Sequence, residues 1–142
     1  MRPIARLLLL GGAAAAGTAA AAGARPDAPP PPPPPPAESG AQIFHRCYAC
    51  HSIEPGENTP AGPSLHGVVG RPIAAMPGFD YSPALRELAR RHGRWTPELL
   101  DRFITDPAAL APGTEMGFIG LADPIRRRIL IDWLASRAPP RD

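Results

Sequence analysis

The stretch Cys47-Tyr48-Ala49-Cys50-His51 has a spacing that is typical of one kind of chemistry. Two cysteines three positions apart, followed at once by a histidine, form the pattern through which a c-type haem is attached covalently. On one helical turn the two thiols reach the two vinyl groups of a single porphyrin, and the adjacent histidine offers its imidazole nitrogen to the iron. The pattern therefore predicts one haem c, bound through Cys47 and Cys50, with His51 as an iron ligand.

Other uses of such a cysteine pair fit this sequence less well. The chain has no further cysteines, so the second pair of ligands that a zinc site needs is missing. A thioredoxin-like redox pair follows a strand of an α/β pattern, and no stretch of this chain alternates between apolar and polar residues as a strand does. A chance occurrence of the pattern is the remaining alternative.

Residues 1–24 have the composition of a secretory signal peptide. A basic start with Arg2 and Arg6 precedes an apolar run, and the segment ends in small residues that suit cleavage after Ala24. A retained membrane anchor is the alternative, because the 18 uncharged residues at positions 7–24 are near the lower length limit of a spanning helix. Both interpretations predict an exported, periplasmic protein, and the second adds a tether to the inner membrane.

Residues 25–38 form a proline-rich linker with eight consecutive prolines, from Pro29 to Pro36. Such a run is a stiff polyproline II rod of about 25 Å, at ~3.1 Å per residue. It is either a tail left behind after cleavage or a spacer that holds the next domain away from a membrane. We expect residues 39–138 to form that domain and residues 139–142 to form a short C-terminal tail.

The charge of the domain is balanced. Leader and linker carry Arg2, Arg6, Arg25 and Asp27, and removing these from the 15 basic and 13 acidic residues leaves 12 of each. All of the positive residues are arginines, because the chain contains no lysine. This balance argues against a nucleic-acid partner. We interpret the run of arginines at positions 126–128 as a solvated face.

The domain is predicted to be all-α, and an amphipathic helix from Ser39 leads into the haem motif. Three later helices share a start pattern, in which a capping residue precedes a proline at the first helical position. These starts are Ser82-Pro83, Thr96-Pro97 and Asp123-Pro124, with ends expected at Gly93 for the first and Asp106-Pro107 for the second. The last helix carries an apolar stripe that we expect to be buried: Ile125, Ile129, Leu130, Trp133 and Leu134.

A haem iron held by one histidine needs a sixth ligand to be a stable electron carrier, and methionine is a common one. Besides the initiator, the chain has two methionines, Met76 and Met116. Met116 follows a Pro-Gly pair in a loop between two predicted helices, where it would face the open side of the ring. We predict Met116 as the ligand, with Met76 and His92 as weaker candidates and core packing as the ordinary role of a methionine.

Between Gly40 and Leu134 the chain resembles the class I c-type cytochromes of the mitochondrial and bacterial soluble type. Beside the haem motif, the resemblance rests on motifs that cover nearly the whole domain: Gly40 and Phe44, residues 62–67, Gly70-Arg71, residues 77–82, Trp95-Thr96, the loop with Met116, and the stripe at 130–134. It implies the class I cytochrome c fold, in which a few helices wrap around one covalently bound haem.

The resemblance also implies roles for individual residues. The carbonyl of Pro63 would accept the other ring N–H of His51 and orient the imidazole. Four residues would hydrogen-bond or neutralise a haem propionate, namely Arg71, Tyr81, Trp95 and Thr114. Ordinary packing is the alternative for the two aromatic residues, and a surface position is the alternative for the arginine.

Four more positions take their roles from the resemblance. Phe118 would shield the haem edge, and the N- and C-terminal helices would cross at Gly40, Phe44 and Trp133. Two departures from the family pattern stand beside these matches. Phe103 occupies a position where relatives often have a tyrosine near the methionine ligand, and Glu115 and Ala108-Ala109 occupy stretches that are rich in lysine in the mitochondrial proteins.

The function that the resemblance implies is one-electron transfer by a monomeric carrier that is not an enzyme. Its redox partners would be respiratory or photosynthetic complexes, such as a cytochrome bc complex and a terminal oxidase. Two alternatives stay open at this point. One is a dedicated haem domain or subunit of a larger oxidoreductase, and the other is a ligand-binding haem protein in which Met116 is not on the iron.

Overall fold

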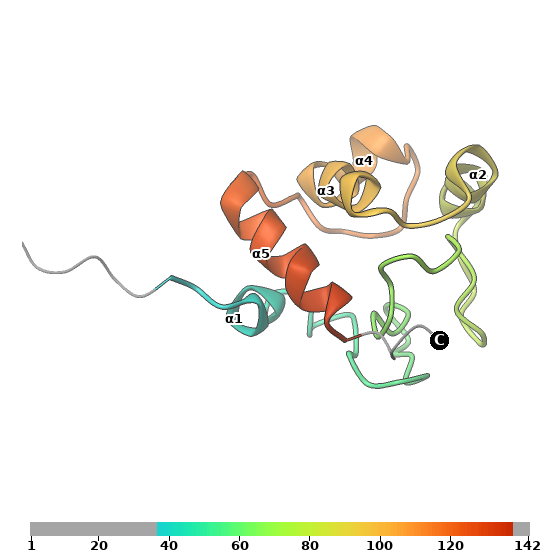
Figure 1. Cartoon of the computed structure of the whole chain (residues 1–142). Coiled ribbons are helices and arrows are strands. Elements are labelled where there is room, and N and C mark those ends of the chain that lie inside the picture. The colour runs from blue at the N-terminus through green and yellow to red at the C-terminus, as the bar shows by residue number, and fades with distance from the viewer. Residues whose placement is uncertain (1–36, 138–142) are drawn as a thin grey trace, which may run out of the picture. The chain divides into compact units, whose positions relative to one another are not determined.

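The computed structural model describes residues 37–137, so the predicted leader, most of the linker and the C-terminal tail lie outside the described residues. Within this range the regular structure is helical (Figure 1). The helices are α1 (Gly40–Phe44), α2 (Pro83–His92), α3 (Pro97–Thr105), α4 (Pro107–Leu110) and α5 (Pro124–Ala135). Residues 37–137 form no strand and only two isolated bridges, Thr59 to Gly62 and Pro72 to Arg94. The all-α prediction is confirmed.

Side-chain caps begin α2, α3 and α5 where the sequence predicts. Ser82, Thr96 and Asp123 each accept a hydrogen bond from a backbone N–H of the first turn. Proline suits the next position because the N–H that it lacks would have no partner there. α2 ends at Gly93, whose φ of 72° lies in the left-handed region that glycine adopts without strain.

α4 is an element that the sequence pattern did not predict. Asp106 ends α3, as expected, but its side chain also accepts a hydrogen bond from the backbone N–H of Ala109 and caps a further helix of four residues. Its φ of −156° is extended, so the chain changes direction at this residue. The pair Asp106-Pro107 therefore marks both the end of α3 and the beginning of α4.

α1 packs across α5 (Figure 1). A Cβ atom on Gly40 would lie 2.1 Å from the Cβ atom of Trp133, so only glycine permits this approach. The ring of Phe44, which is fully buried, lies 5.1 Å from the ring of Trp133 between centroids. The crossing of the N- and C-terminal helices at these residues is confirmed.

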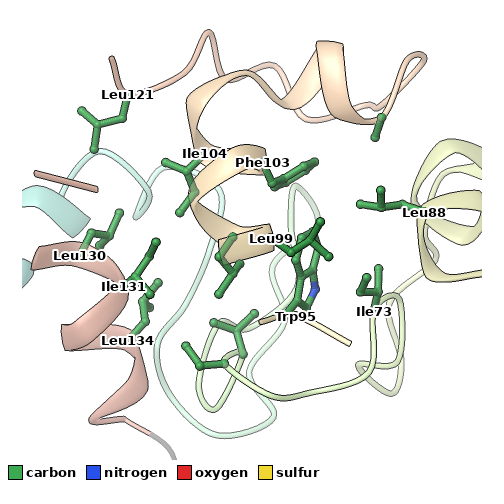
Figure 2. Close-up of a cluster of buried hydrophobic side chains, with 14 of the residues drawn as sticks. Ile73, Leu88, Trp95, Leu99, Phe103, Ile104, Leu121, Leu130, Ile131 and Leu134 are labelled. Atoms are coloured by element: carbon green, nitrogen blue, oxygen red, sulfur yellow. The ribbon is translucent and has the colours of Figure 1, made fainter. Parts of the chain in front are cut away.

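α3 lies in the middle of the hydrophobic core. Figure 2 shows its Leu99, Phe103 and Ile104 between side chains of α5 on one side and Leu88 of α2 with Ile73 on the other. The side chains of α5 that the figure labels are Leu130, Ile131 and Leu134.

The stripe on α5 differs from the prediction at two positions. Ile125 is 70% exposed, whereas Ile131 is buried beside α3. Because α5 packs against both α1 and α3, the buried surface covers two faces of the helix rather than the single predicted stripe.

Arg127 also differs from the prediction of a solvated face. It is 8% exposed, and its Nε donates to the Asp101 carboxylate of α3 at 2.7 Å. Its Nη1 donates to the carbonyls of Leu121 and Ala122 at 2.9 and 2.8 Å. The planar guanidinium offers several donors at fixed angles, which lets one side chain join α3 to the segment before α5. The prediction holds for the exposed Arg128 and is wrong for Arg127.

Candidate functional site

The haem motif follows α1 directly and forms tight turns. The backbone N–H groups of Cys50 and His51 both donate to the carbonyl of Cys47, at 3.0 and 2.8 Å, which places the two thiols on one turn. Both thiols are free; Cys47 is half-buried and Cys50 is exposed. Burial, with a smaller contribution from the Cys50 thiolate, raises the pKa of Cys47 to about 11.

The segment Gly62-Pro63 holds the imidazole of His51 from one side. Nδ1 of His51 lies 2.8 Å from the carbonyl oxygen of Pro63. When Nδ1–H donates to that carbonyl, Nε2 keeps its lone pair for a metal. A Cβ atom on Gly62 would lie 2.6 Å from Cε1 of His51 and 2.5 Å from the carbonyl oxygen of Cys50, so glycine allows the ring to pack against the backbone.

The imidazole is in the protonation state that binds metals. Desolvation lowers the pKa of His51, the hydrogen bond to Pro63 opposes this shift, and the positive charge of Arg71 lowers the pKa further. The ring is therefore neutral at pH 7, as a ligand to iron has to be.

Thr59 joins the haem motif to this segment, a role that the sequence analysis missed. Its hydroxyl donates to the carbonyl of Cys50 at 2.6 Å and accepts from the N–H groups of Ala61 and Gly62 at 3.2 and 3.1 Å. No local motif marks this threonine, because the role depends on the turn that the bridge from Thr59 to Gly62 closes.

Arg71 brings a half-buried positive charge to the site. Its Nη1 and Nη2 donate to the carbonyls of His66 and Ser64, at 3.1 and 2.9 Å. Burial lowers the pKa of Arg71, and the nearby Tyr81 opposes the shift. Among residues 37–137, no carboxylate forms an ion pair with this guanidinium. A half-buried cation without a counter-ion favours an anion, such as the propionate of a haem.

The structure brings Tyr81 and Trp95 to the same place as Arg71. The backbone N–H of Trp95 donates to the carbonyl of Arg71 at 3.0 Å, and Tyr81 is close enough to influence the pKa of the arginine. The phenol of Tyr81 accepts from the N–H of Met76 at 3.3 Å, which leaves its own proton available. The indole of Trp95 is buried, and its N–H donates to none of the described residues. All three side chains thus keep a donor for an anion.

We use the name methionine loop for residues 112–120. Met116 and Phe118 are half-buried and pack against the hydrophobic core. The hydroxyl of Thr114 accepts from the N–H of Met116 at 3.3 Å. The N–H of Leu121 donates to the carbonyl of Ile104 at 2.8 Å, so the end of the loop is fixed to α3.

The methionine loop also faces the start of α2. Glu115 lines a cavity of about 450 Å³ together with Tyr81, Arg86 and Arg90, among other residues. The cavity places one of the predicted propionate ligands next to the loop that carries Met116. Met76 is not among the residues that line this cavity, and its backbone N–H donates to the phenol of Tyr81 at 3.3 Å.

These residues fit a single covalent haem by their chemistry. Two thiols lie on one turn, a neutral imidazole is oriented by a carbonyl, and a half-buried guanidinium has no acidic partner among the described residues.

Relatives of the chain identify the family. Cytochrome c-550 of Ancylobacter novellus is 38% identical over 97 residues, which are 68% of this chain and 91% of that protein. The chain belongs to the class I c-type cytochromes. The c-type cytochrome cy of Rhodobacter capsulatus is 42% identical over 99 residues, which are 69% of this chain and 47% of that protein. The structure of cytochrome c2 from Rhodospirillum centenum matches with a TM-score of 0.65 and 31% identity, over 70% of this chain and 96% of that one.

No family model matches the chain. The relatives nevertheless confirm the predictions of a covalent haem c on Cys47 and Cys50 and of electron transfer. Like its relatives, this cytochrome is an electron carrier. None of the described helices is long and apolar enough to cross a membrane. The choice between a cleaved signal peptide and an anchor concerns residues 1–24, which lie outside the described range.

Proposed function

We propose that this cytochrome is a periplasmic one-electron carrier whose haem iron is held by His51 and Met116. The observation that carries the proposal is the state of His51, whose ring is neutral and whose Nδ1 is engaged by the Pro63 carbonyl. Nε2 is therefore the ring nitrogen whose lone pair is free to bind the iron. Met116 supports the second half of the proposal, since it lies half-buried in a loop that borders the cavity beside Tyr81.

The other site residues hold the cofactor and set its surroundings. When bound, the haem supplies reversible one-electron redox chemistry. Arg71, Tyr81 and Trp95 would donate to propionate oxygens, and Thr114 would add a donor beside Met116. Phe118 would shield the haem edge from water. A dry, low-dielectric setting and the identity of the axial ligands are the means by which such a protein sets the reduction potential.

The partners that we propose are redox proteins of respiratory or photosynthetic membranes, such as a cytochrome bc complex and a terminal oxidase. A carrier of this kind works as a monomer and docks through a small, transient interface. The balanced charge and the proline-rich linker favour one alternative, a haem domain that serves a single larger oxidoreductase. Co-purification of a stable partner complex would support that alternative.

The test of the ligand assignment is a potentiometric titration of the purified holoprotein, followed optically, with carbon monoxide added to the reduced form. We expect a high potential and no carbon monoxide shift in the wild type and in Met76→Leu. Met116→Leu keeps the volume of the side chain but removes the sulfur, so its reduced form is expected to bind carbon monoxide at a lowered potential. Carbon monoxide binding by the wild type would contradict the assignment and indicate a ligand-binding haem protein.

Whether residues 1–24 are cleaved or retained is tested separately. An intact mass of the mature protein that begins at Arg25 would establish cleavage, whereas a mass that includes residues 1–24 would establish an anchor.

A further inference from the structure

Ile119 is the most exposed of the large apolar side chains in the described part of the chain, at 97%. Its neighbours fix the backbone that presents it. Gly120 packs so closely that a Cβ atom there would lie 2.1 Å from the carbonyl oxygen of Thr105, and Leu121 donates to the carbonyl of Ile104. On the other side, Phe118 packs against the core. The exposure of Ile119 therefore belongs to a segment that is anchored on both sides.

The segment that carries Ile119 has no positive charge of its own. Two arginines reach its backbone from other elements: Arg127, which is buried and paired with Asp101, and Arg91, whose Nη2 donates to the carbonyl of Leu110. Residues 106–123 contain three acidic residues, Asp106, Glu115 and Asp123, and no basic residue. All three are exposed. The arginines that line the cavity with Glu115 already pair with other carboxylates, Arg86 with Asp80 and Arg90 with Glu87.

The same stretch also carries little polar side-chain surface. Ala108, Ala109, Gly117 and Ala122 are exposed and uncharged. Covering such residues displaces water without leaving charged groups unpaired, which is what the centre of an interface requires.

We propose that residues 106–123 form a docking face with Ile119 at its apolar centre, and that its partner is a redox protein with an apolar docking site and a basic rim. The proposal rests on the proposed function, in which Met116, three residues before Ile119, is the iron ligand. An acidic rim on the partner would meet Asp106, Glu115 and Asp123, and like charges across an interface are strongly unfavourable. A basic rim meets the same three carboxylates with complementary charge.

The test uses voltammetry of the full-length holoprotein on gold electrodes coated with two mixed monolayers. One combines methyl and ammonium termini, and the other combines methyl and carboxylate termini. We expect the electron-exchange rate constant to be higher on the methyl–ammonium surface. The rate constant is compared rather than the adsorbed amount, because an exposed arginine outside the docking face, such as Arg94, can hold the protein on carboxylates in another orientation.

Two isoleucine variants locate the contact. Ile119→Ser is expected to weaken adsorption on the methyl–ammonium surface about tenfold, which corresponds to ~1.4 kcal/mol. Ile125→Ser changes an isoleucine that is also exposed, at 70%, but lies on α5 outside the docking face, and it is expected to behave as the wild type. Both side chains are exposed, so the optical spectrum of the haem should be unchanged in either variant.

Faster exchange on the methyl–carboxylate surface would overturn the proposal, and so would equal losses in the two isoleucine variants. These results are distinct from a failure of the proposed function. That failure appears as carbon monoxide binding by the reduced wild type, whereas a wrong docking face leaves the resistance to carbon monoxide intact.

Discussion

The crossing of α1 with α5 and the methionine loop are held in place by different means. At the crossing, Gly40 brings two helices into contact and the ring of Phe44 is fully buried against Trp133. The methionine loop has no regular structure and is fixed mainly at its ends, while Ile119 stands in solvent. The crossing is thus specified by the packing of the chain itself, and we expect the loop to take its remaining stability from the bound haem.

The largest loss of stability is expected from Gly40→Ala, which disrupts the packing of α1 against α5. The new methyl group would lie 2.1 Å from Cβ of Trp133 and 3.0 Å from the carbonyl oxygen of Ile129, so the helices would have to separate. We expect a loss of about 3 kcal/mol in the free energy of unfolding. Guanidinium denaturation of the holoprotein measures it. Ala41→Ser, on the exposed side of α1, is the control and should stay within about 0.5 kcal/mol of the wild type.

Arg127→Met tests whether the buried hydrogen bonds at the start of α5 also stabilise the fold. The variant removes three hydrogen bonds and leaves the Asp101 carboxylate without its partner. We expect a loss of about 2–3 kcal/mol in the free energy of unfolding. Arg128→Met, at a side chain that is 85% exposed, is the matched control and should have almost no effect. Equal effects in the two variants would show that the buried contacts of Arg127 contribute nothing.

Gly120→Ala attacks the methionine loop instead. With a φ of 102° and a backbone carbonyl 2.1 Å from the new methyl group, alanine would push the end of the loop away from α3. We expect a loss of about 2 kcal/mol. Unlike Gly40→Ala, this variant should also allow carbon monoxide to bind the reduced form, because the displaced loop carries Met116.

Gly117→Ala is the control for that experiment. It lies in the same loop, but a Cβ atom there meets nothing within 4 Å. We expect wild-type stability and no binding of carbon monoxide. Carbon monoxide binding by Gly40→Ala but not by Gly120→Ala would contradict this expectation, because it would show that the crossing of α1 with α5, and not the methionine loop, protects the iron.

The smallest effect is expected from Tyr81→Phe, and its pH-dependent part appears only in alkaline solution. Desolvation raises the pKa of Tyr81 in the folded protein, whereas the phenol of an unfolded chain titrates at about pH 10. Between these two pKa values the folded state keeps a proton that the unfolded state has lost, so the free energy of unfolding falls as the pH rises. Below about pH 10 this contribution is fully present.

Denaturation at several pH values between about 9 and 11 measures the slope for the wild type and for Tyr81→Phe. The variant should show a smaller decline, with a difference of at most about 1 kcal/mol at neutral pH from the lost hydrogen bond. An unchanged slope would mean that Tyr81 does not keep its proton more strongly in the folded state.

The sequence predicted those parts of the fold that depend on adjacent residues. Each capping residue accepts a hydrogen bond from a backbone N–H within the next turn, so the starts of α2, α3 and α5 could be predicted from adjacent residues. The burial of Arg127 was not readable in this way, since it depends on acceptors in α3 and in the preceding segment. The exposure of Ile125 and the burial of Ile131 were missed for the same reason, because α5 packs against two neighbours.

The same distinction applies to the candidate site, where motifs of adjacent residues were predictable and contacts between distant segments were not. The haem motif was evident from its spacing alone, and the resemblance to the family supplied the predicted roles of Pro63, Arg71 and the other residues of the site. Thr59 was missed because its hydroxyl acts between two backbone segments that meet only after folding. The exposure of Ile119 also needed the structure, since an isoleucine in a loop with Gly and Phe neighbours is ordinarily buried.

The thiol of Cys47 makes the timing of assembly matter. Burial raises its pKa to about 11, so in the folded chain it holds less of the thiolate, the reactive form of cysteine, than an exposed cysteine with a pKa of about 8.5. The folded arrangement therefore slows thioether formation at this sulfur, whereas an unfolded chain exposes it to solvent. Biogenesis of the holoprotein is expected to run from cross-link to fold, with the porphyrin joined to a nascent chain before the core closes around it.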